Sequence, residues 1–372
     1  MKVLFVFGTR PEAVKLSPVI NRMRDASPLQ PVVCNTAQHV SLLQPVLELF
    51  QVGVDVDLGV MSPGQALGGL SARILERLEA VFTDVDPAAV VVQGDTTSTF
   101  CGALSAFYHR RPVGHVEAGL RTGNFDAPFP EEMNRVLTTR LARWHFAPTA
   151  SNRQALLDEG VLDADIYLTG NPVIDALQEM RERIEGNGLS HETQALLTRF
   201  TRPFILVTGH RRESFGAPFR ALCQGLRDLA ERHPDLDLVY PVHLNPEVQR
   251  PVRALLAGAT NVHLLGPLDY EAFLALMYRA RFVITDSGGV QEEAPALGKP
   301  VLLMREETER KEALGGAVEM VGTQPSRIIA AAERLLTDEA HYARMARSQS
   351  PFGDGRAAQR IVSILENALH AH

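Results

Sequence analysis

The sequence has few cysteines, no leader typical of secretion and no apolar run long enough to cross a membrane. Three cysteines, Cys34, Cys101 and Cys223, are scattered over 372 residues without metal-ligand spacing. An odd and scattered set disfavours a disulfide framework and fits a reducing compartment. Only a five-residue apolar run precedes Gly8, which is too short for a signal peptide, and a membrane helix needs roughly 18 apolar residues. We therefore expect a cytoplasmic protein with no membrane partner.

The sequence also lacks a surplus of positive charge and the common cofactor motifs. Its net charge of −7, with 45% hydrophobic and 22% charged residues, argues against a nucleic-acid partner and for an ordinary globular protein. No G-x-G-x-x-G follows an apolar run, and no Walker A loop, H-E-x-x-H pair or G-x-S-x-G elbow occurs. We expect no cofactor and no metal. What remains is a redox-free reaction on a phosphorylated or nucleotide-linked substrate.

Short apolar runs alternate with longer segments of helical period along the whole chain. This alternation predicts an α/β fold in which parallel sheets are covered by helices on both faces. The clearest predicted strands are Val3–Phe7, Ala89–Val92, Phe204–Val207, Leu238–Tyr240, Phe282–Ile284 and Val301–Met304. The clearest predicted helices are Leu67–Phe82, Phe219–Arg232 and Ser326–Leu336.

The chain is too long for one typical core, so two domains of similar size are expected. The strand–helix pattern restarts near Pro203, after a polar, helix-like segment from Asp175 to Phe200, and Asn171-Pro172 is a plausible junction. We predict two Rossmann-like domains, 1–171 and 172–354, with sheets that face a central cleft. The last segment, 355–372, is predicted to be a helix.

Polar or glycine-rich residues follow six of the predicted strands. Ligands of open parallel sheets bind beyond the carboxyl ends of the strands, so these six turns are expected to converge on one cleft. Their chemistry favours an enzyme. The turns are Gly8–Arg10, Gln93–Thr97, His115–Glu117, Thr208–Arg212, Pro241–His243 and Thr285–Gly289.

The first of these turns, within the stretch Gly8–Pro18, leads from a buried strand into a helix. Thr9 and Glu12 have capping-box spacing, and Arg10 and Lys15 lie at the same helix N-terminus. Two cations at a helix N-terminus suit a polyanion such as a diphosphate. The alternative is an ordinary capped helix with two solvated cations.

Three carboxylates, Asp95, Glu117 and Glu131, lie in or near the turns of the first half. If they share a cleft, crowding of like charges should raise the pKa of at least one and create an acid or base near neutral pH. Each also has a structural alternative. Asp95 could belong to a helix cap, Glu117 could pair with Arg121 on the surface, and Glu131 could be a first-turn acidic residue.

The second half carries a cationic turn and a glycine turn. His210 and Arg211 follow a strand and favour an anion site, although His210 could be a structural histidine. In the glycine turn, Ser287 and the adjacent Gly288 and Gly289 allow backbone N–H groups to approach phosphate oxygens. The alternative there is a turn that needs a positive φ. One helical turn later, Glu293 is placed to accept hydrogen bonds from ribose hydroxyls.

Long motifs spread over residues 8 to about 355 closely resemble those of the non-hydrolysing bacterial UDP-N-acetylglucosamine 2-epimerases. The resemblance implies a GT-B arrangement, interconversion of UDP-GlcNAc and UDP-ManNAc without a cofactor, a homodimer, and return of the C-terminal helix to the N-terminal domain. The matching stretches are GTRPEAVKLSP, TAQH, QGDTTST, GHVEAGLRTG, PFPEEMNR, TGNPVIDAL, VTGHRRESFG, YPVHLNP, TDSGGVQEEAPALGKPVLLMRE-x-TER and PFGDG.

The resemblance assigns roles to residues of this chain. Asp95, Glu117 and Glu131 would transfer protons and position the sugar, with His210 stabilising UDP or relaying a proton. The sequence does not say which carboxylate is the base and which the acid. Glu293 would hold the ribose, and Leu268 and Phe273 the uracil. The diphosphate would be held by Arg10, Lys15, Ser287, Gly288, Gly289 and Arg310. Further substrate-binding positions are Arg135, Arg211, His243 and Asn245.

One departure from the family pattern concerns activation by a second substrate molecule. Relatives that are activated in this way have an arginine where this chain has Gly64, before Gln65, and use a segment equivalent to 38–41. The departure puts such activation in doubt for this chain, and the sequence does not decide whether the substrate is also an activator. Three other functions remain as alternatives: a hydrolysing epimerase, a GT-B glycosyltransferase that uses a UDP-sugar donor, and a catalytically silent nucleotide-sugar sensor.

Overall fold

The chain forms two compact units, each built around its own parallel β-sheet. In the computed structural model the described residues are 1–37, 40–61, 64–126, 128–211 and 214–370. The N-terminal unit contains Met1–Ala176 and Phe352–His372, and the C-terminal unit contains Leu177–Pro351. These junctions differ from the expected 171/172 and 354/355. Gln38, His39, Arg212 and Glu213, which belong to quoted motifs, lie outside the described residues.

The N-terminal unit has a seven-stranded sheet in the order β3-β2-β1-β4-β5-β6-β7, and every pairing is parallel. Its strands are β1 (Lys2–Phe7), β2 (Gln30–Asn35), β3 (Val56–Asp57), β4 (Ala89–Gln93), β5 (Val113–Val116), β6 (Trp144–Ala147) and β7 (Ile166–Leu168). Its helices are α1 (Arg10–Ala26), α2 (Val40–Leu49), α3 (Leu67–Val85), α4 (Thr97–Tyr108), α5 (Glu131–Leu141), α6 (Ala150–Asp158), the start of α7 (Pro172–Glu185) and α15 (Ala357–His370). A short 3₁₀ helix, η1 (Asp163–Asp165), precedes β7.

The C-terminal unit has a six-stranded sheet in the order β10-β9-β8-β11-β12-β13, again parallel throughout. Its strands are β8 (Phe204–Thr208), β9 (Asp237–Pro241), β10 (Val262–Leu265), β11 (Val283–Thr285), β12 (Val301–Leu303) and β13 (Val318–Met320). Its helices are α8 (His191–Thr198), α9 (Ala217–Arg232), α10 (Pro246–Leu256), α11 (Tyr270–Arg279), α12 (Val290–Ala296), α13 (Pro325–Thr337) and α14 (Glu339–Ala346). Another 3₁₀ helix, η3, covers Lys311–Ala313.

The predicted α/β class with two parallel sheets is confirmed, and the central strands show why the apolar runs signalled it. Strands β4 and β8 are buried along their whole length, and β1 is buried after Lys2. A strand covered by helices on both faces has no solvent side, so it appears as a continuous apolar run rather than an alternating one. Among the described helices, none combines the length and apolar character required to cross a membrane.

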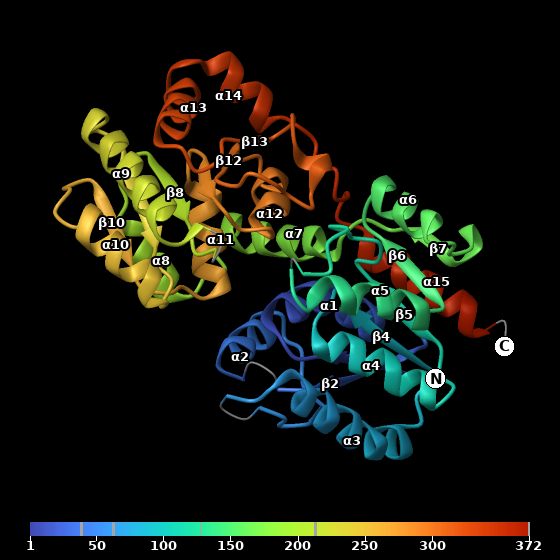
Figure 1. The fold of residues 1–372 in the computed structure, drawn as a ribbon. Coiled ribbons are helices and arrows are strands. Elements are labelled where there is room, and N and C mark those ends of the chain that lie inside the picture. The colour runs from blue at the N-terminus through green and yellow to red at the C-terminus, as the bar shows by residue number, and fades with distance from the viewer. Residues whose placement is uncertain (38–39, 62–63, 127, 212–213, 371–372) are drawn as a thin grey trace. The chain divides into compact units, whose positions relative to one another are not determined.

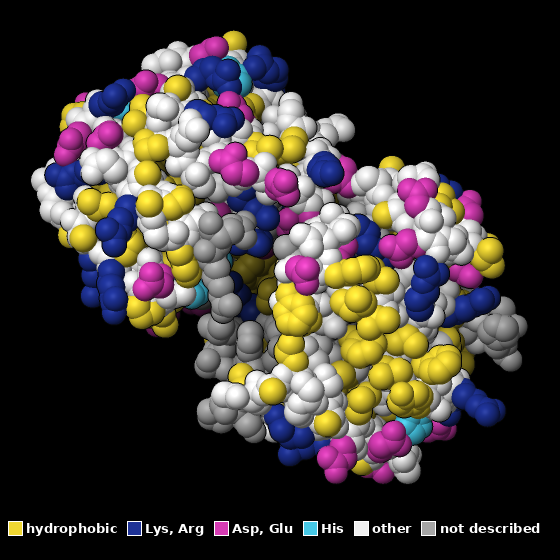
Figure 2. Space-filling view, viewed as in Figure 1, with side chains coloured by type: hydrophobic (Ala, Val, Ile, Leu, Met, Phe, Trp, Pro, Cys, Tyr) yellow, Lys and Arg dark blue, Asp and Glu magenta, His cyan; other side chains and the backbone are white. Residues whose placement is uncertain are grey.

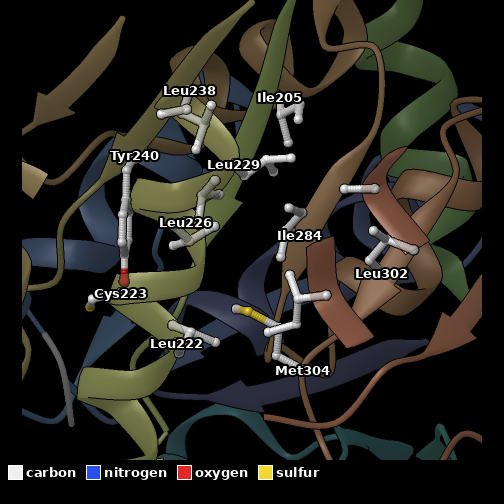
Figure 3. Close-up of a cluster of buried hydrophobic side chains, with 14 of the residues drawn as sticks. Ile205, Leu222, Cys223, Leu226, Leu229, Leu238, Tyr240, Ile284, Leu302 and Met304 are labelled. Carbon is white, nitrogen blue, oxygen red and sulfur yellow. The ribbon is translucent and has the colours of Figure 1, made fainter. Parts of the chain in front are cut away.

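The core of the C-terminal unit shows how one helix face meets this sheet (Figure 3). Leu222, Leu226 and Leu229 of α9 repeat at helical spacing and are buried with Ile205 of β8. Tyr240 of β9 is also buried, and its hydroxyl donates a hydrogen bond of 2.9 Å to the carbonyl of Gly209. The core therefore supports the turn that follows β8.

The polar segment predicted as helix-like from Asp175 to Phe200 forms two helices. Helix α7 ends at Glu185 and α8 begins at His191. The break falls at Gly186–Gly188, where Asn187 has a left-handed φ of 57°. Asparagine and glycine adopt this conformation more readily than other residues, so they end the first helix.

The last helix of the chain, α15, packs within the N-terminal unit. Figure 1 shows α15 in red beside elements from the beginning of the chain. It contacts α1, and Asp175 of α7 caps its N-terminus by accepting hydrogen bonds of 3.1 and 2.9 Å from the N–H groups of Ala357 and Ala358. The side chain of a residue 182 positions earlier thus replaces the usual local cap.

We predict that Asp175→Ala lowers the free energy of unfolding of the N-terminal unit by about 1 kcal/mol, the usual cost of losing an N-cap. Urea unfolding followed by fluorescence of the single tryptophan measures this, because Trp144 is buried in β6 of the same unit. Asp163→Ala is the control, because it removes an exposed, single ion pair with Arg153 in the same unit, a kind of pair worth little. Equal effects of the two substitutions would contradict the capping role.

Candidate functional site

In the N-terminal unit, three turns that were selected as candidate site segments follow the adjacent strands β1, β4 and β5. Gly8 follows β1, Asp95 lies two residues after β4, and Glu117 directly follows β5. Strands β1, β4 and β5 are neighbours in the sheet and run in parallel, so their carboxyl ends lie at one edge. The sheet order therefore brings together turns that are far apart in sequence.

Glu117 is held by side chains from three separate parts of the N-terminal unit. Lys15 Nζ lies 2.5 Å from its Oε1, Asn171 Nδ2 donates to the same oxygen at 3.0 Å, and the Gln93 amide donates to Oε2. The side chains of Glu117 and Lys15 are both nearly buried. Glu117 also has a left-handed φ of 64°, which is uncommon for a residue with a side chain. Strain of this kind, held in place by several contacts, clusters at functional sites.

The alternative partner considered for Glu117 is excluded by the geometry. Arg121 pairs instead with Glu159, with Nε 2.6 Å from Oε1, and donates to the hydroxyl of Thr139. The alternative interpretation, a surface salt bridge between Glu117 and Arg121, is therefore wrong, because Glu117 pairs with Lys15 of α1. Its loop is tightly packed: a Cβ on Gly119 would lie 2.2 Å from the carbonyl oxygen of Asn152.

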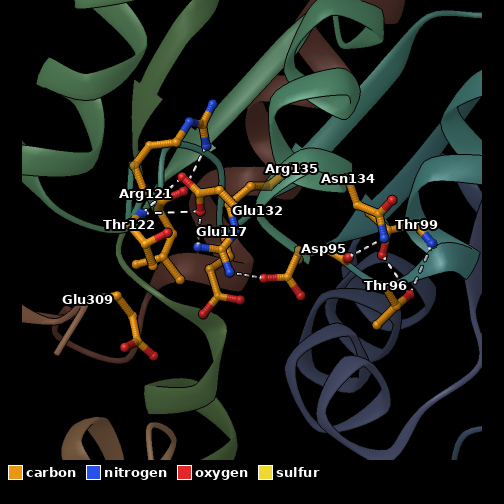
Figure 4. Close-up of polar contacts among 12 residues, drawn as sticks. Asp95, Thr96, Thr99, Glu117, Arg121, Thr122, Glu132, Asn134, Arg135 and Glu309 are labelled. Atoms are coloured by element: carbon orange, nitrogen blue, oxygen red, sulfur yellow. Dashed lines mark hydrogen bonds and ion pairs between the residues drawn. The ribbon is translucent and has the colours of Figure 1, made fainter. Parts of the chain in front are cut away.

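Asp95 pairs with Arg135 of α5, with Arg135 Nη2 2.5 Å from Asp95 Oδ2 (Figure 4). Burial raises the pKa of Asp95 above its ordinary 3.8; Arg135 opposes this rise, and the nearby Glu117 charge adds to it. The expectation that crowding raises a carboxyl pKa thus has the right direction, but burial is the larger cause. Asp95 does not cap the next helix, because Thr96 Oγ1 accepts the Thr99 N–H there.

Glu12 links the first turn to the second. Its Oε2 accepts the N–H groups of Gly8 and Thr9 at 3.1 and 2.8 Å, and its Oε1 accepts the hydroxyls of Thr96 and Thr99 at 2.8 and 3.1 Å. Burial raises the pKa of Glu12, and these hydrogen bonds oppose the rise. The carboxylate that the sequence marked as half of a capping box therefore also fixes the turn beside Asp95.

Glu131 and Glu132 start α5 but have different surroundings. Glu132 is almost completely buried and bonds to Arg135 and to the backbone of the loop that follows Glu117. Glu131 is half-buried, and its side chain makes no hydrogen bond or ion pair with any residue in the described ranges. The contacts thus join Glu132, rather than the expected Glu131, to the network around Asp95.

The other sequence-selected cation of this unit is Arg10, which begins α1 and is half-buried. Gln93 and Asn171 were present in quoted motifs, but sequence reasoning gave them no role. Their partner Glu117 lies 24 and 54 positions away, so no local pattern could have paired them. Gly64, the position of the family departure, has a left-handed φ of 66°, and the neighbouring Gln65 bonds to Arg73.

In the C-terminal unit, the turns after β8 and β11 are joined by Asp286. Asp286 Oδ2 accepts the N–H groups of His210 and Arg211 at 2.7 and 2.8 Å, and its Oδ1 lies 3.6 Å from His210 Nδ1. The ring of His210 stacks on that of His243, with centroids 5.2 Å apart. Asp286 was quoted as part of a motif without a role. In the structure, Asp286 orients the turn that contains His210.

The glycine turn before α12 faces Arg310. A Cβ on Gly288 would lie 2.8 Å from Arg310 Nη1, so only glycine fits there without a shift. Arg310 pairs with Glu292 and Glu309. Burial alone would raise the pKa of Glu309, but Arg310 and Arg305 outweigh it and lower the pKa to about 2. A guanidinium is thus held beside the backbone N–H groups of the turn.

The remaining expected contacts lie on neighbouring elements of the same unit. Glu293 Oε1 accepts the hydroxyl of Tyr270 at 3.0 Å, and Phe273 lies half-buried in the first turns of α11. Leu268, also half-buried, lies just before that helix. Asn245 caps α10 by accepting the N–H of Glu247, so its side chain has a structural role. Ser287 follows Asp286, and its backbone N–H donates a hydrogen bond of 3.0 Å to Thr285 Oγ1.

Within the described ranges, no group of three or more histidine, cysteine or acidic side chains is arranged to hold a metal ion. The three cysteines are buried and form no disulfide.

Comparison with known proteins connects these features. Residues 21–366 match the sequence profile of the family described as UDP-N-acetylglucosamine 2-epimerase. The chain is 50% identical over 371 residues to the UDP-N-acetylglucosamine 2-epimerase of Yersinia pestis, covering 99% of each protein.

Two solved structures are similar over nearly the full length. The UDP-GlcNAc 2-epimerase from Neisseria meningitidis bound to UDP-GlcNAc has a TM-score of 0.93 at 42% identity, with 99% of this chain and 100% of that chain covered. The Methanocaldococcus jannaschii enzyme in complex with UDP-GlcNAc and UDP has a TM-score of 0.84 at 32% identity, with the same coverage. The expected GT-B-like fold is thereby confirmed. On the full-length identity, the profile match and the fold together, the chain belongs to the UDP-N-acetylglucosamine 2-epimerase family.

Proposed function

We propose that this chain is an isomerase that interconverts UDP-GlcNAc and UDP-ManNAc by inverting C2 of the sugar. Family membership and the full-length similarity to enzymes bound to UDP-GlcNAc or UDP support the substrate. The observation that carries the reaction is a pair of carboxylates, the partly buried Asp95 and the nearly buried Glu117, each held against its own cation at one sheet edge.

The chemistry requires such a pair. C2 of an N-acetylhexosamine is not adjacent to a carbonyl, so its proton is too weakly acidic for simple removal and return. In the proposed route a base takes the C2 proton, the C–H electrons form a C1=C2 double bond, and the C1–O bond to UDP breaks. The products of this step are 2-acetamidoglucal and UDP. Re-addition of UDP to C1, with a proton delivered to the other face of C2, gives the epimer.

In the N-terminal unit, Asp95 and Glu117 are proposed to transfer protons, with Glu131 as a third carboxylate of the set. A partly buried carboxyl with a raised pKa, such as Asp95, suits a group that must both take and release a proton. Glu117 has two hydrogen-bond donors and one cation fixed on it, which suits a group that must keep its orientation. Lys15, Arg10 and Arg135 are the proposed substrate-binding cations of this unit.

In the C-terminal unit, the turns after β8 and β11 are proposed to bind UDP. The orientation of His210 by Asp286 supports a contact from its ring to the diphosphate or a proton relay. Glu293 is proposed to bind the ribose, and Leu268 and Phe273 the uracil. The remaining proposed contacts of the nucleotide are Arg211, His243, Asn245, Ser287, Gly288, Gly289 and Arg310.

We also propose a homodimer through the exposed face of α4 and α5. These two helices pack side by side, and Figure 2 shows hydrophobic side chains gathered over this part of the surface. Phe107 and Tyr108 of α4 are 60% and 62% exposed, and Met133 and Leu137 of α5 are 37% and 39% exposed. A group of large apolar side chains on adjacent helices is typical of a protein–protein contact.

In heavy water, we expect UDP-GlcNAc to become UDP-ManNAc that carries deuterium at C2, with no net release of UDP. Proton NMR of the C2 position measures this directly, because the abstracted proton exchanges with solvent before re-addition. Net formation of UDP and free sugar would instead select a hydrolysing epimerase. Turnover only with an added acceptor would select a glycosyltransferase, and binding without any turnover a sensor.

For Asp95→Asn, we expect turnover to fall by roughly 10²–10⁴, the usual contribution of a general acid or base. Calorimetry should show unchanged affinity for UDP, because the substitution leaves the proposed nucleotide contacts intact. Asp163→Asn is the matched control, because Asp163 pairs with Arg153 on the surface. Near-normal turnover of Asp95→Asn would remove Asp95 from the catalytic set.

We predict that Leu137→Arg converts a dimer into a monomer, because a buried guanidinium without a partner is strongly unfavourable in an interface. Sedimentation equilibrium measures the mass. Leu162→Arg is the control, since Leu162 is 69% exposed in the same unit but is not part of α4 or α5. A dimer that persists in Leu137→Arg would place the interface elsewhere.

A further inference from the structure

Glu132 is a carboxylate of the network around Asp95 that has no role in the proposals above. Glu132 is 1% exposed, and its oxygens accept the N–H of Thr122 at 3.0 and 3.1 Å and that of Gly123 at 2.9 Å. These two residues belong to the loop that begins at Glu117. Glu132 Oε2 also accepts a hydrogen bond of 3.0 Å from Arg135 Nη1.

Arg135 therefore bridges the buried carboxylate of Glu132 and the partly buried carboxylate of Asp95. Its Nη1 lies against Glu132 and its Nη2 against Asp95, as Figure 4 shows. A guanidinium has a rigid planar fork, so fixing one arm fixes the direction of the other. Glu132 and Arg135 are also three residues apart on α5, which places their side chains on the same helix face.

We propose that Glu132 is a positioning residue for the reaction: it aims Arg135 at Asp95 and anchors the loop that follows Glu117. The inference rests on the proposed function for its catalytic meaning. Through one side chain, α5 fixes the surroundings of both carboxylates that are proposed to transfer protons. Glu132 itself touches no reacting atom in this scheme.

The charges around Asp95 determine in which direction its pKa should move when Glu132 is changed. Arg135 from α5 and Lys15 from α1 favour the ionised form of Asp95, while Glu117 from the turn after β5 opposes it. The groups that face Glu132 are Arg135 and the backbone of Thr122 and Gly123, and the nearby Arg121 is paired with Glu159.

The Glu132 charge partly cancels that of Arg135. Removing the Glu132 charge should therefore leave more of the Arg135 charge to act on Asp95, and should make Asp95 a stronger acid. A carboxylate that contributes only to stability and lies away from Arg135 and Asp95 would have no such effect on the pKa of Asp95.

The test is Glu132→Gln, which keeps the shape and one acceptor oxygen but removes the charge. We expect the pKa of Asp95 to fall by about half a unit to one unit, a common size for the loss of one neighbouring charge. Carbon-13 NMR of aspartate-labelled protein measures it, with the Asp95 resonance identified by its loss in Asp95→Asn. This readout needs no turnover, so it decides the inference even if the wild-type protein fails to epimerise UDP-GlcNAc.

Kinetics provide the second readout. We expect Glu132→Gln to lower kcat by about tenfold or more, with KM for UDP-GlcNAc changed by less than about threefold, because the substitution acts on the chemical step. The limb of the pH–rate profile that Asp95 generates should move to lower pH. An Asp95 titration that matches the wild type, together with kcat within about twofold, would overturn the proposal.

Asp175→Asn is the matched control. Asp175 is also a buried carboxylate that accepts two backbone N–H groups in the same unit, but it lies against α15 and not against Arg135. It should lower thermal stability without moving the Asp95 titration. An equal shift in both variants would mean that Glu132 acts only through stability, and would overturn the proposal.

If Glu132→Gln yields too little folded protein, Glu132→Asp replaces it in the kinetic test. The shorter side chain keeps the charge but cannot reach both the loop N–H groups and Arg135. Loss of kcat by about tenfold with unchanged UDP affinity would support the positioning role. Wild-type kcat would contradict it.

Discussion

The N-terminal unit depends on ion pairs that hold buried or partly buried carboxylates against cations from other elements. Lys15 and Glu117 form an ion pair at 2.5 Å with little exposure of either side chain. Breaking such a pair by removing one partner commonly costs about 3–5 kcal/mol, because an uncompensated buried charge remains. The first turn, the β5 turn and Asn171 must therefore stay together for Glu117 to remain in place. Beside the neighbouring strand β4, Arg135 in the same way compensates the charges of Asp95 and Glu132.

The C-terminal unit uses the same principle to arrange its turns. Asp286 is buried and holds the backbone of His210 and Arg211, and Arg310 lies between Glu292 and Glu309 beside the glycine turn. Preorganised donors and charges of this kind stabilise developing charge without having to move during the reaction. The proposed site for a departing diphosphate needs this property, because in the proposed route the leaving group gains charge as the C1–O bond breaks.

The proposal of proton transfer rests on the two carboxylates, each paired with a cation. Burial raises the pKa of Asp95, while Arg135 prevents the rise from becoming larger. Glu132 also pairs with Arg135, so in the proposal above its charge also influences the pKa of Asp95. In this view the tuning of Asp95 is a property of α5 and of two sheet turns together, rather than of Asp95 alone.

The sequence by itself determined the fold class, the position of the main strands and helices, and membership of the family, because apolar periodicity and long motifs are local properties. It also pointed to the turns after β1, β4, β5, β8 and β11. Only the tertiary structure decided that Glu117 pairs with Lys15 rather than Arg121, that Glu132 rather than Glu131 enters the Asp95 network, and that Asp175 caps α15. Pairings across the sheet depend on strand order and helix orientation, which no local pattern encodes.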